Sequence, residues 1–123
     1  MKRRSYRKLI SSAPEGGRHH HAVYVVLLDP KVAKDRRLLA LNPKRNAAKP
    51  CVYVGMTGLS PQERFRNHKD GIKAARVVER YGAKLLPELY EHLNPMPFEA
   101  AAQMEHDLAE DLRAQGYTVA GGT

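Results

Sequence analysis

Residues 51–68 read CVYVGMTGLSPQERFRNH, and they predict a strand, a turn and a helix in that order. The first five residues are mostly β-branched or aromatic and end at a glycine, as strands often do. Ser60 predicts the helix start, because a proline occupies the first helical position and Glu63 can complete a capping box. Arg64 and His68 are four positions apart, so they lie on one face of that helix.

This stretch also has the composition of an anion site. A tyrosine, a tight glycine turn and two basic side chains are expected close to the N-terminus of one helix. The free N–H groups of a helix N-terminus attract anions, and phosphate groups are a common example. The stretch therefore predicts a site for a phosphate group.

The same residues resemble the signature of the GIY-YIG nuclease family. Tyr53-Val54-Gly55 is similar to the second tripeptide of the signature, and Thr57 and then Arg64-x-x-x-His68 follow it. Ala22-Val23-Tyr24 resembles the first tripeptide, with alanine in place of the first glycine. Glu105 corresponds to the acidic residue that the family carries on a late helix, so the resemblance covers roughly residues 21–120.

The resemblance implies a metal-dependent endonuclease that hydrolyses phosphodiester bonds in DNA, with weak sequence specificity or selectivity for DNA structure. Glu105 would bind Mg²⁺ or Mn²⁺, and Arg64 would stabilise negative charge in the transition state. Either Tyr24 or His68 would activate the attacking water, and Tyr53 would position that group or the phosphate. These five residues are the expected catalytic set.

The distribution of charge independently indicates a polyanionic partner. The net charge is +8, but residues 1–50 carry 13 Lys/Arg against 3 Asp/Glu, a balance of +10. Residues 51–123 carry 8 against 10, a balance of −2. Nucleic acid is the first expectation, ahead of an acidic membrane surface; a merely soluble cationic protein is the alternative.

The basic residues fall into two segments outside the expected core. Residues 1–20 are expected to form a flexible basic arm, which contacts phosphates or only aids solubility, and residues 21–123 to form a single domain. Within that domain, residues 31–50 are expected to be a long basic insertion without clear structure, apart from a helical turn near Arg36–Leu41. The residues expected to contact nucleic acid are Lys34, Arg36, Arg37, Lys44, Arg45, Lys49, Thr57, Arg66 and Lys69.

Several other classes of protein are excluded by composition. One cysteine cannot form an internal disulfide or a cysteine-based zinc site, and it fits a reducing compartment. No apolar run approaches the roughly 18 residues that a membrane-spanning helix needs. We therefore expect a cytoplasmic protein without a membrane partner.

The remaining elements predict an α+β fold, with a small central three-stranded, mainly antiparallel sheet flanked by helices. Residues 21–28 predict a first strand buried on both faces, and residues 82–90 hold a third short strand before a proline. Residues 117–120 could add a terminal strand. A helix is expected from Ser60 to about Tyr81, with Gly71 as a candidate point of perturbation and with a core-facing stripe that consists of Phe65, Ile72 and Ala75.

The helix expected at residues 97–115 places Glu105 in an unusual position. Helical spacing gathers Phe98, Ala101, Met104, Leu108 and Leu112 on one side, and Glu99, Gln103, Asp107, Glu110 and Asp111 on the other. Glu105 lies within the apolar side, where an unpaired carboxylate costs several kcal/mol. From the residues alone, an ion pair with Arg64 and a divalent-cation site explain it equally well; the family resemblance favours the metal.

A second class of function competes with the nuclease. The chain could be a non-catalytic nucleic-acid-binding module that retains the GIY-YIG fold and the basic first half. RNA is an alternative to DNA as the substrate. The nuclease would be weakly sequence-specific or structure-selective, or it would take its specificity from a homodimer or a protein partner. Metal-dependent cleavage separates the two classes, whereas salt-dependent binding does not.

Overall fold

A four-stranded mixed sheet organises residues 19–122, the part of the chain that the computed structural model describes. The strands are β1 (Ala22–Leu28), β2 (Cys51–Thr57), β3 (Gly82–Leu85) and β4 (Thr118–Gly121), in the order β3-β1-β2-β4. β1 pairs antiparallel with β2 and β3, whereas β2 pairs parallel with β4. Residues 1–18 of the expected basic arm lie outside the part of the chain that the structure describes.

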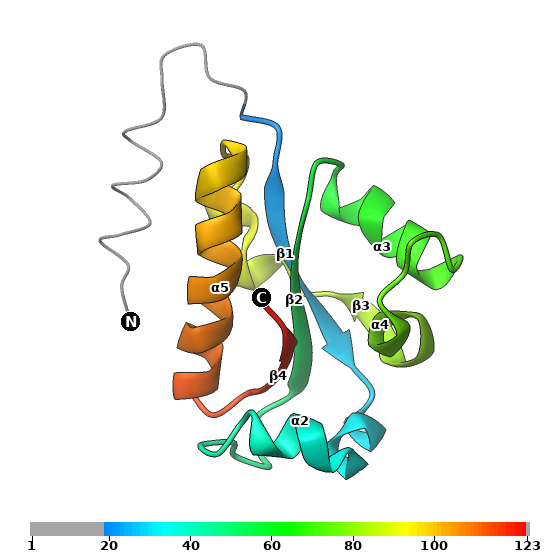
Figure 1. Ribbon diagram of the computed structural model, residues 1–123, viewed down its shortest axis with the longest axis vertical. Coiled ribbons are helices and arrows are strands. Elements are labelled where there is room, and N and C mark those ends of the chain that lie inside the picture. The colour runs from blue at the N-terminus through cyan, green and yellow to red at the C-terminus, as the bar shows by residue number, and fades with distance from the viewer. Residues whose placement is uncertain (1–18, 123) are drawn as a thin grey trace.

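Helices cover both faces of this sheet, which confirms the α+β class. Figure 1 shows α5 (Phe98–Ala114) on one face, and α3 (Pro61–Lys69) and α4 (Arg76–Tyr81) on the other. Short 3₁₀ helices, η2 (Pro87–Leu89) and η3 (Glu91–Leu93), connect β3 to α5. None of the helices in residues 19–122 has both the length and the apolar character needed to cross a membrane.

The predicted three-stranded sheet is wrong in strand number, because β4 adds a parallel edge strand. α5 returns the chain to the end of the sheet where β2 starts, so β4 can run parallel to β2. Parallel strands require such a crossover connection. The buried side chain of Asn42 then covers the outer edge of β4. Its Oδ1 accepts from the N–H of Val119 at 2.9 Å, and its Nδ2 donates to the carbonyl of Val119 at 3.1 Å.

The β1–β2 hairpin confirms a strand that is buried on both faces. Tyr24 is paired with Gly55, and Val26 with Tyr53, so these four residues share the face covered by α3. Valines of the alternate positions in both strands lie on the opposite face, and they are fully buried. The hairpin therefore places both signature tyrosines on one side of the sheet.

The helix expected from Ser60 to Tyr81 is interrupted in the structure. Its start is as predicted, because Ser60 Oγ accepts from the Glu63 N–H at 3.1 Å in a capping box. α3 nevertheless ends at Lys69, since Gly71 (φ +77°) and Lys73 (φ +47°) adopt left-handed conformations that a right-handed helix cannot continue.

The break also changes which side chains reach the core. Ile72 lies between the two helices and is 51% exposed, so its expected place in the core-facing stripe is wrong. Phe65 and Ala75 pack against the core as expected.

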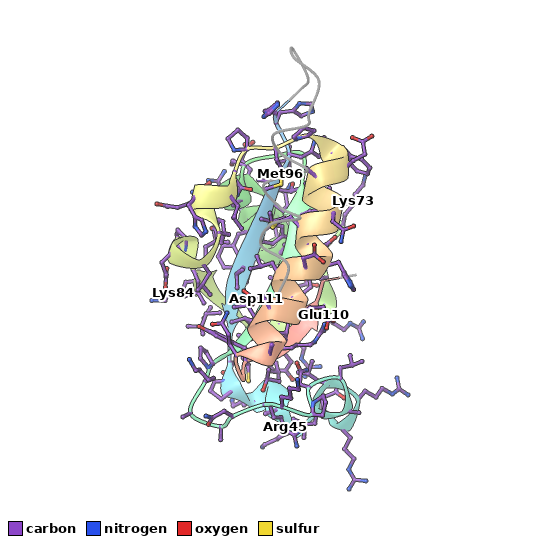
Figure 2. All side chains as sticks on the ribbon, turned by 90° about the vertical axis from the view of Figure 1, so that its left-hand side faces the viewer. Arg45, Lys73, Lys84, Met96, Glu110 and Asp111 are labelled. Atoms are coloured by element: carbon purple, nitrogen blue, oxygen red, sulfur yellow. The ribbon has the colours of Figure 1, made fainter. Side chains whose placement is uncertain are left out.

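The long helix α5 confirms most, but not all, of its expected pattern. The apolar side is buried except for Phe98, which is 55% exposed and packs edge-on against the ring of His21. Asp107 and Asp111 were expected to face solvent but are buried. Figure 2 labels Asp111, next to Glu110 on α5. Side-chain amides satisfy both buried carboxylates: Gln103 donates to Asp107, and Gln115 donates to Asp111.

The connection between β1 and β2 is structured rather than irregular. It contains the 3₁₀ helix η1 (Pro30–Lys34) and the short helix α2 (Arg36–Ala40), which confirms the expected helical turn. The carboxylate of Asp35 caps α2 by accepting from the N–H groups of Arg37 and Leu38. Together with Asn42, this connection forms part of the packed structure around β4.

Candidate active site

Four elements bring the five expected catalytic residues into one cluster. Tyr24 comes from the middle of β1, Tyr53 from β2, Arg64 and His68 from α3, and Glu105 from α5. The ring centroids of the two tyrosines and the histidine lie 5.8–6.2 Å apart. The charges of Arg64 and Glu105 both act on the pKa values of the two phenols, so both charged groups lie within electrostatic range of the rings.

A buried hydrogen bond between Tyr24 and His68 lies at the centre of this cluster. Tyr24 is 1% exposed and His68 is 0% exposed, and the Tyr24 hydroxyl lies 2.7 Å from Nε2 of His68. The other ring nitrogen, Nδ1, accepts a hydrogen bond from the backbone N–H of Ala75 at 3.0 Å. Because Nδ1 is an acceptor, the neutral ring carries its proton on Nε2 and donates it to the Tyr24 oxygen.

The environment keeps His68 in this neutral form. Burial and the nearby charge of Arg64 lower the pKa of His68 from 6.5 to about 4. At neutral pH the imidazole is therefore an uncharged donor to Tyr24. The hydroxyl proton of Tyr24 remains available for a second acceptor.

Both phenols are protonated in the isolated protein. Burial, with a smaller effect of Tyr53, raises the pKa of Tyr24 well above 10, while the charge and hydrogen bonding of Arg64 act in the opposite direction. Burial and the negative charge of Glu105 raise the pKa of Tyr53. Forming a phenolate at Tyr24 consequently requires additional positive charge close to the ring.

Two glycines provide the space that the tyrosine rings occupy. A Cβ at Gly55 would lie 2.6 Å from both Cζ and Oη of Tyr24, so any side chain there would displace the ring. Gly121 has φ +75°, and a Cβ on it would lie 2.7 Å from Cε1 of Tyr53. Gly55 lies in the stretch that resembles the signature. Gly121 was not identified from the sequence, and the pair Gly121-Gly122 is the only sequence feature that marks it.

Arg64 does not form the ion pair that was considered for Glu105. Its guanidinium donates instead to the backbone carbonyls of Ile72 at 3.2 Å and Lys73 at 2.9 Å. The break between α3 and α4 exposes these carbonyls, so the irregular segment fixes the arginine. A guanidinium has five N–H donors, and further donors remain for an anion.

Glu105 has the properties expected of a carboxylate that binds a cation. It is half-buried, and burial raises the pKa of its carboxyl group. No hydrogen bond or ion pair joins its carboxylate to another residue of the described part of the chain. Residues 19–122 contain no cluster of three or more His, Cys, Asp or Glu arranged to hold a metal. Mg²⁺ fits a lone carboxylate, because it retains several waters and often completes its coordination with substrate phosphates.

Some residues expected to contact nucleic acid make contacts within the fold. Thr57 is buried, and its hydroxyl accepts from a backbone N–H in the following turn. Arg45 donates to two carbonyls after and within α2, and Lys69 donates to three carbonyls around the end of α4. The ammonium group of Lys49 lies 5.4 Å from the ring centroid of Tyr117.

The other expected contacts are exposed cations. Within residues 19–122, their charged groups form no hydrogen bond or ion pair, so they are available to an anionic partner. This group consists of Lys34, Arg36, Arg37, Lys44 and Arg66.

The fold and the cluster together define an α+β protein with a buried Tyr–His pair beside an arginine and an unpaired carboxylate. No family model, curated protein or solved structure matches this chain. The likeness to GIY-YIG nucleases therefore depends on the residues of the chain itself.

Proposed function

We propose that this chain is a metal-dependent endonuclease of the GIY-YIG type, which hydrolyses phosphodiester bonds in DNA with weak sequence specificity or selectivity for DNA structure. The observation that carries the proposal is the buried Tyr24–His68 hydrogen bond, in a cluster with Arg64 and the unpaired Glu105. Phosphodiester hydrolysis needs an acceptor for the proton of water and positive charge near the phosphate. This cluster contains groups suited to both tasks.

In this proposal, Tyr24 is the group that activates water, and His68 is its positioning residue. His68 is unsuited to accept a proton, because its Nδ1 already accepts a hydrogen bond from the backbone N–H of Ala75 and its Nε2 already carries a hydrogen. The Nε2–H group instead stabilises a phenolate on Tyr24. The phenolate takes a proton from water, the water oxygen bonds to phosphorus, and the bond between phosphorus and the leaving oxygen breaks.

Positive charge in the site has two proposed sources. Arg64 is fixed by two carbonyls and would stabilise the charge that develops on the phosphate oxygens. A divalent cation bound through Glu105, Mg²⁺ or Mn²⁺, would supply charge for the leaving oxygen when present. The charge of Arg64 also favours the phenolate form of Tyr24.

Cleavage of supercoiled and branched DNA in Mg²⁺, Mn²⁺ or EDTA tests the proposal. We expect metal-dependent cleavage by the wild type, none by Glu105→Ala, and wild-type cleavage by Glu99→Ala, which removes an exposed carboxylate from the same helix. Equal cleavage by wild type and Glu105→Ala would contradict the proposed site. The same assay with RNA in place of DNA tests whether RNA is the substrate.

A non-catalytic nucleic-acid-binding module is the second candidate. The observation that favours it is the engagement of Arg64 with two backbone carbonyls, which gives this residue a structural role. Binding of nucleic acid by the wild type without cleavage in any of the three conditions would support this candidate.

A further inference from the structure

A basic groove lies between the connection that follows β1 and helix α4. Figure 1 shows α4 on the same side of the sheet as α3. The groove has a volume of about 770 Å³. Its lining contains a single acid, Asp35, and the cations Lys31, Lys34, Arg37, Arg76 and Arg80. The groove depends on η1 and α2, and therefore on the insertion at residues 31–50.

The positive charge of this groove is not compensated within the described residues. No side-chain hydrogen bond or ion pair within residues 19–122 engages the charged groups of the five cations. The carboxylate of Asp35 is occupied as the cap of α2, where it accepts from two backbone N–H groups. Five cations beside one engaged carboxylate fit an anionic occupant with several charges.

The groove also has an apolar surface. Val32 and Leu38 are buried in its wall, and Leu41 is 60% exposed at its rim. The ring of Tyr81 is half-buried, with the Arg80 guanidinium 5.5 Å from its centroid. Single-stranded nucleic acid offers unpaired bases to apolar and aromatic surfaces and phosphates to cations, whereas a duplex keeps its bases stacked inside.

The groove reaches the immediate neighbourhood of the catalytic cluster. Gly121 lines it, and the missing Cβ of this glycine would meet the ring of Tyr53 at 2.7 Å. One residue thus borders both the groove and the signature tyrosine. A strand lying in the groove would approach the cluster from the end of β4.

We propose that this groove binds a single-stranded segment of nucleic acid that continues from the cleaved position. The inference rests on the proposed nuclease function and narrows its substrate to nucleic acid with a single-stranded part. The relevant cations are those that line the groove, rather than the whole basic insertion.

Fluorescence anisotropy in EDTA tests this inference without cleavage. The full chain is titrated against a labelled single-stranded DNA oligonucleotide and against the duplex of the same sequence. Arg37→Ala and Arg80→Ala are each compared with Lys84→Ala, which removes an exposed cation of β3 that does not line the groove and is labelled in Figure 2.

We expect tighter binding of the single strand than of the duplex. Arg37→Ala and Arg80→Ala should each weaken single-strand binding roughly tenfold, about the contribution of one charge-assisted hydrogen bond. The affinity of the control should stay within about twofold of that of the wild type. Each groove variant should reduce the slope of log affinity against log salt concentration by about 0.7.

Two results would overturn the inference. One is an equal loss of binding in Lys84→Ala and Arg37→Ala; the other is duplex binding at least as tight as single-strand binding. Neither result would affect Glu105-dependent cleavage, so the proposed function would survive. Conversely, groove-dependent binding by a wild type that never cleaves would retain the binding site and reject the nuclease.

Discussion

The hydroxyl of Tyr24 and Nε2 of His68 lie 2.7 Å apart in a buried position, with the other nitrogen of the imidazole bonded to the backbone of Ala75. This arrangement fixes the direction of the hydrogen bond, because a nitrogen that accepts cannot also carry the proton of a neutral ring. His68 is therefore a donor to Tyr24, and the proposed acceptor for the proton of water is the tyrosine oxygen.

The first prediction concerns the dependence of cleavage on pH. Since burial raises the pKa of Tyr24, the phenolate fraction should grow about tenfold per pH unit across the neutral range, and kcat/KM should rise with it. Steady-state cleavage in Mg²⁺ between pH 6 and about pH 9 measures this slope. A rate that does not change with pH across this range would instead fit His68 as the base, because its pKa of about 4 lies below the range.

The second prediction concerns the dependence of stability on pH. The native pKa of His68 is about 4 against 6.5 for an unperturbed histidine, so the unfolded state binds more protons between these values. The free energy of unfolding should fall as pH decreases through this window, by up to roughly 3 kcal/mol at about 1.4 kcal/mol per pKa unit. Urea unfolding of wild type and His68→Gln measures the effect, which should be absent from the variant. Parallel curves would show that His68 does not titrate as described.

The third prediction concerns Gly55. A methyl group in Gly55→Ala would lie 2.6 Å from Cζ of Tyr24, so the ring must move or the strands must separate. We expect a loss of about 2 kcal/mol of stability, typical of overpacking, together with loss of cleavage. The control is Gly58→Ala, whose Cβ would meet Nε2 of His21 at an ordinary 3.4 Å. Similar melting temperatures for the two variants would contradict the close fit.

The fourth prediction separates the function of Glu105 from its effect on stability. Burial raises the pKa of this carboxyl, so above that pKa its negative charge opposes folding. Glu105→Gln should therefore be at least as stable as the wild type without metal, while losing cleavage.

Thermal unfolding with and without Mg²⁺ measures both parts of this prediction. At about 100 times its Kd, Mg²⁺ should stabilise the wild type by about 2.7 kcal/mol, and it should not stabilise Glu105→Gln. An equal response of both proteins would place the cation elsewhere.

The fifth prediction concerns the edge of the sheet. Asn42→Ala leaves both the N–H and the carbonyl of Val119 without the partners that Asn42 provides. We expect a loss of about 3 kcal/mol in the free energy of unfolding, because buried polar groups left unpaired are costly. Chemical denaturation checks this value, and replacement of the exposed neighbour in Lys44→Ala serves as the control. A change below about 0.5 kcal/mol would show that water replaces the lost bonds.

The features that sequence could predict are those with local causes. The capping box at Ser60 and Glu63 needs only residues within one helical turn, and the burial of β1 on both faces follows from its nearly continuous aliphatic residues. The position of Glu105 on the apolar side of its helix follows from helical spacing. These signals predicted the first two strands and the starts of the helices, whereas the five candidate site residues were expected from the resemblance to GIY-YIG nucleases.

The features that sequence missed depend on contacts between distant segments. The strand at β4 could be expected from its own residues, but its parallel pairing with β2 and its contact with Asn42 could not, because both partners lie far away in the sequence. The break before α4 involves Lys73, whose left-handed conformation is uncommon for a lysine. The structural use of Arg45 depends likewise on carbonyls that only the fold brings near.

The parallel pairing of β2 with β4 has a consequence for the order of folding. The two strands lie more than sixty residues apart in the chain, and contacts of such separation form late because the intervening loop must close first. Gly121, which makes room for the ring of Tyr53, arrives with β4. A nascent chain that has emerged only as far as α5 would already contain all five residues of the cluster. Its sheet would still lack the strand beside Tyr53, so the proposed activity would begin only after residues 118–121 had joined it.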